Sequence, residues 1–136
     1  MDGSKTAISK VKKLFAKENL KGDFRVMDYI QLNFPDNYFD AVIDIVSIEH
    51  NRLRNVPIIL NEIRRVLKPH GKLFSMVVAT GTFYGPFKNT GYVHFYKLRE
   101  IKKLFKFFKI LSIEQNERTK NNMKDKVIHW NVTCEK

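Results

Sequence analysis

The chain has 136 residues, 43% of them hydrophobic and 12% aromatic, which is enough for one domain with a buried core and excludes global disorder. It carries 25 Lys and Arg against 14 Asp and Glu, for a formal net charge of +11. No apolar run reaches the roughly 20 residues of a membrane span, no apolar leader is visible, and the single Cys134 excludes an internal disulfide, so we expect a cytoplasmic protein.

The first third of the sequence predicts one helix and two strands. A helix is predicted over residues 4–18, because apolar residues recur there with the 3.6-residue period and Ser4 can cap the first turn. A short strand is predicted over 24–28 and a turn over 35–37. The nearly continuous apolar stretch 39–48 is typical of a strand that is buried on both faces of a parallel sheet.

The rest of the sequence alternates between the two element types. Pro57 begins a predicted helix that ends at Pro69 and Gly71, and a second buried strand follows over 72–79. Residues 80–95 are rich in Gly and aromatic residues and predict a loop, and a basic helix is predicted over 97–108. Residues 109–118 and 126–136 alternate between apolar and polar, which indicates an antiparallel pair. The pattern as a whole indicates an α/β domain.

Two stretches carry a resemblance to a known family. They are LNFPDNYFDAVIDIVSIEHN (32–51) and NEIRRVLKPHGKLF (61–74), the second similar to a helix-turn-strand motif written E-x-x-R-V-L-K-P-G-G-x-L. With both at this spacing, the chain resembles the class I S-adenosylmethionine-dependent methyltransferases, of the type 11-like group. The resemblance implies one domain over 1–136, with a Rossmann-like three-layer fold and a C-terminal antiparallel strand pair.

The resemblance also implies a cofactor site for S-adenosylmethionine. Asp2 falls where the family has the carboxylate that accepts from the ribose hydroxyls, and Asp28 where a carboxylate accepts from the adenine amino group. Tyr29 and Ile30 would flank the adenine ring. The backbone of residues at the end of the next strand would approach the methionine part of the cofactor. These residues are Asp44, Ile45 and Val46.

The family's glycine-rich cofactor loop has no counterpart in this sequence. In the family, an acidic-Gly-x-Gly-x-Gly loop precedes the second strand, and its glycines let the backbone approach the cofactor closely. The sequence begins at the position of the ribose-binding Asp2, so we expect an N-terminally truncated fold without strands 1 and 2 and an impaired enzyme. In the family's sheet order 3-2-1-4-5-7-6, this leaves the edge of the strand at 39–48 exposed. We expect a fragment, a direct pairing of strands 3 and 4, or pairing with a second copy in a homo-oligomer.

Four residues are candidates for contact with the substrate. His50 is a candidate base because its ordinary pKa lies near neutrality, and Glu49 is a second catalytic candidate beside it. His94 and Tyr84 lie in the aromatic-rich loop and are candidate substrate contacts. Each also has a simpler interpretation, as a positioning residue, a solvated charge or a loop anchor. The four scattered His residues do not form a metal motif.

The sequence leaves three functions open. The first is methyl transfer to a small-molecule or saccharide-like acceptor. The second is an inactive remnant that acts as a binding or oligomerising module. The third is methylation of a nucleic acid, because residues 63–136 carry sixteen Lys and Arg against five acids. No nucleic-acid motif accompanies this charge, so we expect a small-molecule substrate rather than a nucleic-acid partner.

Overall fold

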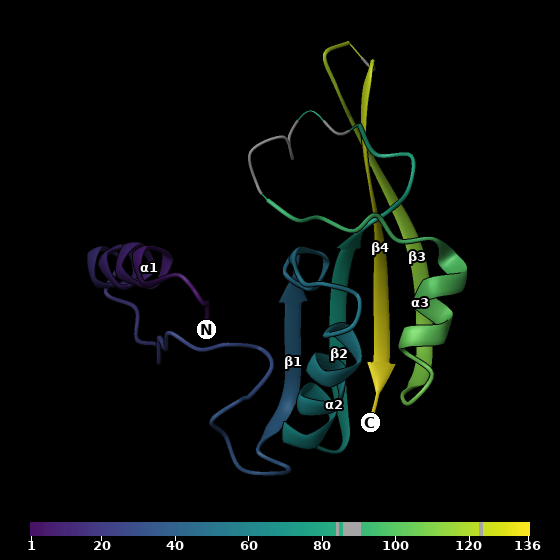
Figure 1. Ribbon diagram of the computed structural model, residues 1–136. Helices are drawn as coiled ribbons and strands as arrows, with labels where there is room; N and C mark the ends of the chain where they lie inside the picture. The colour runs from purple at the N-terminus through teal and green to yellow at the C-terminus, as the bar shows by residue number, and fades with distance from the viewer. Residues whose placement is uncertain (84, 86–90, 123) are drawn as a thin grey trace. The chain divides into compact units, whose positions relative to one another are not determined.

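The computed structural model describes residues 1–83, 85, 91–122 and 124–136. The chain forms two compact units, Met1–Asn33 and Phe34–Lys136, which are described separately below. Among the described residues, the first unit contains helix α1, and the second contains four strands, two further α-helices and a short 3-10 helix (Figure 1).

Helix α1, Lys5–Lys17, begins as the sequence predicts. The Ser4 hydroxyl accepts a hydrogen bond from the Ala7 backbone N–H at 3.2 Å, which satisfies one unpaired donor of the first turn. Ile8 is buried, and Phe15 packs edge-on against Phe24 with ring centroids 4.7 Å apart. These contacts hold the helix against the segment that follows it.

The strand predicted over residues 24–28 is reduced to a single bridge. Val26 pairs with Asp2 in parallel, and the Met27 N–H donates to the Asp2 carbonyl at 3.1 Å. The prediction of a full strand is therefore wrong within the described residues, although the paired position and direction agree with two neighbouring parallel strands.

The second unit is built on a four-stranded mixed sheet. Its order is β1-β2-β4-β3, with β1 parallel to β2 and with β4 antiparallel to both of its neighbours (Figure 1). The strands are β1 (Phe39–Ile45), β2 (Leu67–Val78), β3 (Lys109–Lys120) and β4 (Asp125–Glu135). The predicted C-terminal antiparallel pair is confirmed, and so is the α/β class.

Helix α2, Val56–Val66, connects β1 to β2 and supplies much of the core. Pro57 lies in its first turn, where a missing N–H leaves no hydrogen bond unmade. Five of its apolar side chains are buried, and they repeat with helical spacing: Val56, Ile59, Leu60, Ile63 and Val66. The helix therefore packs one full apolar stripe against the sheet.

Three predicted boundaries differ from the structure. The strand over 39–48 ends at Ile45, because Val46 has a φ of 57°, and a 3-10 helix, η1, covers Ile48–His50. Strand β2 begins at Leu67 rather than at residue 72. Helix α3 covers only Leu98–Leu104, because Phe105 leaves the helical conformation and residues 105–108 form a turn.

The early start of β2 is made possible by an irregularity in its pairing with β1. Phe39 pairs with Leu67 and Ala41 with Lys72, so the extra β2 residues 68–71 bulge out of the ladder. His70 has a φ of 63° there, and a Cβ on Gly71 would lie 2.8 Å from the Lys68 carbonyl oxygen. Gly71 is therefore required by a close approach of the backbone.

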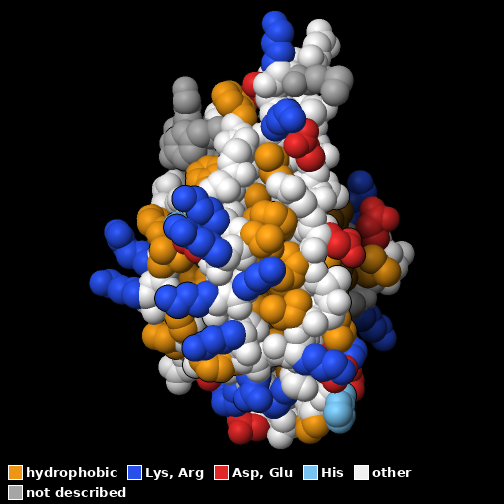
Figure 2. Space-filling view, turned by 90° about the vertical axis from the view of Figure 1, so that its right-hand side faces the viewer, with side chains coloured by type: hydrophobic (Ala, Val, Ile, Leu, Met, Phe, Trp, Pro, Cys, Tyr) orange, Lys and Arg blue, Asp and Glu red, His pale blue; other side chains and the backbone are white. Residues whose placement is uncertain are grey.

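Positive charge gathers on the outer face of α3. Figure 2 shows Lys and Arg side chains over this part of the second unit, next to a band of hydrophobic side chains. The exposed cations of the helix and its following turn are Arg99, Lys102, Lys103 and Lys106.

Within the described residues, no helix has both the length and the apolar character needed to cross a membrane.

Replacing Ile63 with Ala tests the packing of α2. Ile63 is buried at 1% exposure, so Ile63→Ala should lower the free energy of unfolding by about 2–5 kcal/mol through lost burial and a residual cavity. Urea unfolding measures the change. The control is Ile58→Ala on the same helix, where the side chain is 46% exposed and a change within about 0.5 kcal/mol is expected. Equal losses in the two variants would contradict this packing.

Candidate active site at the ends of β1 and β2

Two polar residues meet where the parallel strands β1 and β2 lie side by side. Asp44 is directly opposite Ser75 in the strand register, and the Ser75 hydroxyl donates to Asp44 Oδ2 at 2.7 Å. Asp44 is only 1% exposed. Burial raises the pKa of Asp44 to about 6, and the hydrogen bond from Ser75 limits the rise.

Glu49 is the most unusual side chain of this region. It belongs to η1, which follows β1, and it is fully buried at 0% exposure. Neither of its carboxylate oxygens has a hydrogen-bond partner among the described residues. The pKa of Glu49 is raised to about 7, mainly by burial, with a smaller contribution from the nearby charge of Asp44. A carboxyl group that titrates near neutral pH is suited to accept a proton.

The segment 94–96 is hydrogen-bonded to both η1 and the end of β2. The Tyr96 N–H donates to the Val78 carbonyl at 2.9 Å, and the Thr80 N–H donates to the Tyr96 carbonyl at 3.0 Å. The His94 N–H donates to the Glu49 carbonyl at 2.9 Å. The end of β2 and η1 therefore hold this segment in place.

The Tyr96 hydroxyl adds a third buried polar group. It has no hydrogen-bond partner among the described residues. Burial raises the pKa of Tyr96, and the charge of Glu49 contributes to the rise. The region thus contains two carboxyl groups and a phenol that are removed from water and incompletely hydrogen-bonded. Such groups are characteristic of functional sites.

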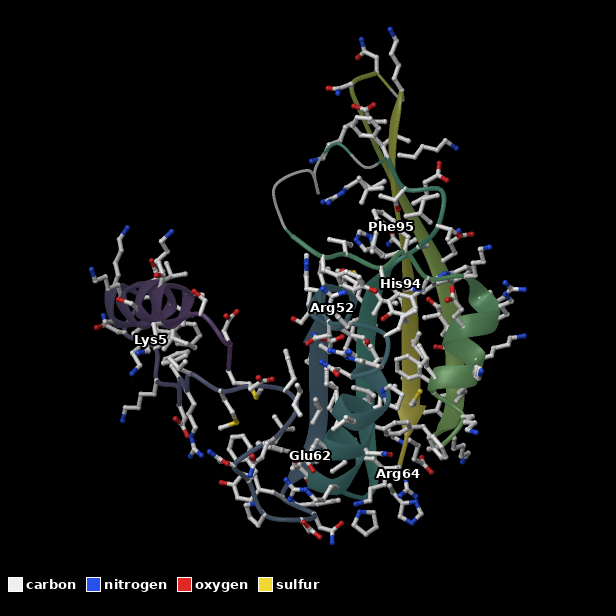
Figure 3. The ribbon with its side chains drawn as sticks, in the orientation of Figure 1. Lys5, Arg52, Glu62, Arg64, His94 and Phe95 are labelled. Atoms are coloured by element: carbon white, nitrogen blue, oxygen red, sulfur yellow. The ribbon has the colours of Figure 1, made fainter. Side chains whose placement is uncertain are left out.

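The two predicted His candidates have different surroundings. His50 is exposed, and its Nδ1 lies 3.3 Å from the Tyr92 carbonyl oxygen. His94 is partly buried, and its Nε2 lies 3.1 Å from Glu100 Oε1. Figure 3 shows His94 at the same end of the sheet as Arg52, whereas Glu62 and Arg64 lie at the opposite end. The remaining candidate, Tyr84, lies outside the described residues.

The predicted residues Ile45 and Val46 lie beside these groups in the chain. Ile45 is half exposed, on the sheet face opposite to Asp44. Val46 has a φ of 57°, which is rare for a β-branched side chain, and its N–H donates to the Met76 carbonyl at 2.9 Å. The strained backbone at Val46 turns the chain away from the sheet and into η1.

The predicted adenosine contacts belong to the first unit. The bridge between Asp2 and Val26 places Asp2 close to the segment that carries Asp28. Asp2 Oδ1 accepts from the Ser4 N–H at 2.7 Å, and Asp28 Oδ1 accepts from the Ile30 N–H at 3.0 Å. Both residues are exposed, and Tyr29 lies between Asp28 and Ile30. The two carboxylates are acceptors of the kind that ribose hydroxyls and an adenine amino group require.

Sequence reasoning missed three residues of this region: Ser75, Tyr96 and Arg52. Ser75 is the polar residue within an apolar strand, and this position is a signal that could have identified it. Tyr96 gives a weaker signal, because it lies among several aromatic residues. No group of three or more His, Cys, Asp or Glu that could hold a metal ion occurs among the described residues.

The arrangement defines a class of protein. It is an open α/β sheet with polar residues near the C-terminal ends of two parallel strands, a feature of doubly wound α/β domains. The methyltransferase-domain family matches residues 1–75, which is more than half of the chain. The chain therefore belongs to this family of S-adenosylmethionine-dependent methyltransferases, as the sequence resemblance predicts. The sequence has no significant match among curated proteins.

Several solved structures share the fold. A SAM-dependent methyltransferase from Methanosarcina mazei superposes with a TM-score of 0.82 at 17% identity, covering 99% of this chain and 79% of that one. The YcgJ protein from Bacillus subtilis gives a TM-score of 0.76 at 12% identity, with 98% and 80% covered.

One similar structure contains ligands. The 1,6-didemethyltoxoflavin-N1-methyltransferase from Burkholderia thailandensis has a TM-score of 0.73 at 15% identity, with 93% of this chain and 56% of that chain covered. It was solved with 1,6-didemethyltoxoflavin and S-adenosylhomocysteine bound. At these identities the likeness establishes the fold.

The buried Glu49 predicts a pH-dependent stability. Its pKa is raised from 4.5 to about 7 in the folded protein, so its contribution to stability is complete below pH 4.5 and is lost as the pH rises through 7. The loss is on the order of 3 kcal/mol, since one pKa unit corresponds to about 1.4 kcal/mol. Glu49→Gln should remove this part of the pH dependence, as measured by urea unfolding between pH 5 and 8.

The matched control for this experiment is Glu114→Gln. Glu114 is an exposed carboxylate of the same unit, on β3, so its replacement should leave the pH profile of the parent protein unchanged. If Glu49→Gln retained the full fall in stability between pH 5 and 8, the raised pKa of Glu49 would be wrong.

Proposed function

We propose that this protein transfers a methyl group from S-adenosylmethionine to a small-molecule acceptor. The observation that carries the proposal is the buried Glu49 carboxylate, without a hydrogen-bond partner among the described residues, at the end of β1 in a methyltransferase-family fold. We also propose that the protein has the three-layer Rossmann-like architecture that the family resemblance implies.

The residues of the first unit fit one part of the cofactor. Asp2 and Asp28 present exposed carboxylates from neighbouring parallel segments, which suits the donors of an adenosine group. When bound, S-adenosylmethionine supplies a methyl group on a positively charged sulfur, and the leaving group needs no further activation. The chain therefore has to position the acceptor and to remove its proton.

Glu49 is the residue that we assign to proton removal. Its pKa of about 7 keeps a substantial fraction ionised at neutral pH, and its unpartnered oxygens can accept a hydrogen bond from the acceptor's hydroxyl or amine. The buried side chains of Tyr96 and Asp44 would exclude water from the Glu49 carboxylate. The charge of Asp44 would also help to keep the pKa of Glu49 raised. His50, which is exposed, is better suited to contact the outer part of the acceptor.

Calorimetry with S-adenosylmethionine tests cofactor binding. We expect saturable binding that is weaker than micromolar, because the sequence contains no Gly-x-Gly-x-Gly loop to bring the backbone close to the cofactor. Asp28→Ala should weaken the binding several-fold, whereas Asp23→Ala removes the same charge from the same unit and should not. Absence of saturable binding at millimolar cofactor, or equal affinity of the Asp28→Ala variant and the parent protein, would contradict the assignment.

The edge of the sheet supports a second proposal, self-association. Strand β1 is one of the two edge strands of the described sheet, and it exposes Ile43 at 70% and Ile45 at 49%. An exposed edge with apolar side chains favours pairing with a second copy. Sedimentation velocity should then show a concentration-dependent dimer that Ile43→Lys shifts toward monomer, while Ile58→Lys on α2 does not. A monomer at all concentrations would rule out this edge as an interface.

A further inference from the structure

Arg52 lies next to the candidate site and has no part in the function described so far. It follows η1 by two residues and is exposed. Its guanidinium carbon lies 5.4 Å from the centre of the Tyr92 ring, which is the geometry of a cation–π contact. Tyr92 is itself 39% exposed, so the pair presents a cation and an aromatic ring to solvent.

Hydrogen bonds join the two backbone segments that carry this pair. The His94 N–H donates to the Glu49 carbonyl at 2.9 Å, and His50 Nδ1 lies 3.3 Å from the Tyr92 carbonyl oxygen. The segments 49–52 and 92–94 are thus joined at several points, although they are more than 40 residues apart in the sequence. Figure 3 shows Arg52 and His94 at the same end of the sheet.

The charges around Arg52 leave it available for an anion. None of the ion pairs found among the described residues includes Arg52. The sequence has no acidic residue from His50 to Asn61. The nearest carboxyl groups along the chain, Asp44 and Glu49, are buried and do not compete at the surface.

We propose that the methyl acceptor carries an anionic oxygen group, a carboxylate or a phosphate, which Arg52 binds beside the ring of Tyr92. This inference rests on the proposed methyltransferase function and adds the chemical class of its acceptor. The planar guanidinium group donates two parallel hydrogen bonds to such a group, and Tyr92 supplies a surface on which a flat acceptor stacks.

Small aromatic probes test this directly by NMR titration in the presence of S-adenosylhomocysteine. The probes are phenyl phosphate, benzoate and the neutral benzyl alcohol. At least one of the two anions should bind tenfold or more tightly than benzyl alcohol, and the comparison between them identifies the preferred group. Arg52→Gln should remove this preference, and Tyr92→Leu should weaken binding several-fold.

The matched control is Arg54→Gln, which removes the same charge two residues away and should leave the anion preference intact. Equal affinity for the neutral probe, or an equal loss in the Arg52→Gln and Arg54→Gln variants, would overturn the proposal. The calorimetry with S-adenosylmethionine distinguishes a failure of the anionic-acceptor proposal from a failure of the proposed methyl transfer. Cofactor binding without an anion preference refutes only the acceptor class, whereas anion binding without cofactor binding refutes methyl transfer and leaves the anion site standing.

Discussion

The parallel pairing of β1 with β2 is the constraint on which the candidate site depends. It puts Asp44 opposite Ser75, where one hydrogen bond of 2.7 Å satisfies part of a buried carboxylate. It also makes the two strands end at the same edge of the sheet, so that η1 and the segment 94–96 meet there. A shift of the register by one residue would turn Asp44 to the opposite face and separate it from Ser75.

The site is costly to the stability of the fold. Buried carboxyl groups with incomplete hydrogen bonding lose their hydration, and this loss raises the pKa values of Asp44 and Glu49. The left-handed backbone at Val46 adds local strain, since its side chain is branched at Cβ. The apolar stripe of α2 and the fully buried residues of β2 offset these costs. The buried carboxyl groups that suit the proposed chemistry therefore lower the stability of the fold at the end of the same strand.

The charged side chains are divided between the protein surface and the buried candidate site. The outer surface of α3 carries exposed cations, whereas the two carboxyl groups of the site are buried. Arg52 belongs to neither group: it is an exposed cation whose guanidinium lies over the Tyr92 ring, 40 residues further along the chain. The net charge of +11 by itself does not distinguish a solvated surface from a binding surface, because it does not record where each cation lies.

The sequence by itself determined the family, the α/β class, the helix over Lys5–Lys17 with its Ser4 cap, the apolar stripe of α2 and the C-terminal strand pair. These features follow from local periodicity and short motifs, which a linear pattern records. Only the tertiary structure decided that β1 ends at Ile45, that Ser75 faces Asp44, that the Tyr96 hydroxyl is buried and that Arg52 lies over the Tyr92 ring. Those outcomes depend on strand register and on contacts between segments more than 30 residues apart, which no local pattern contains.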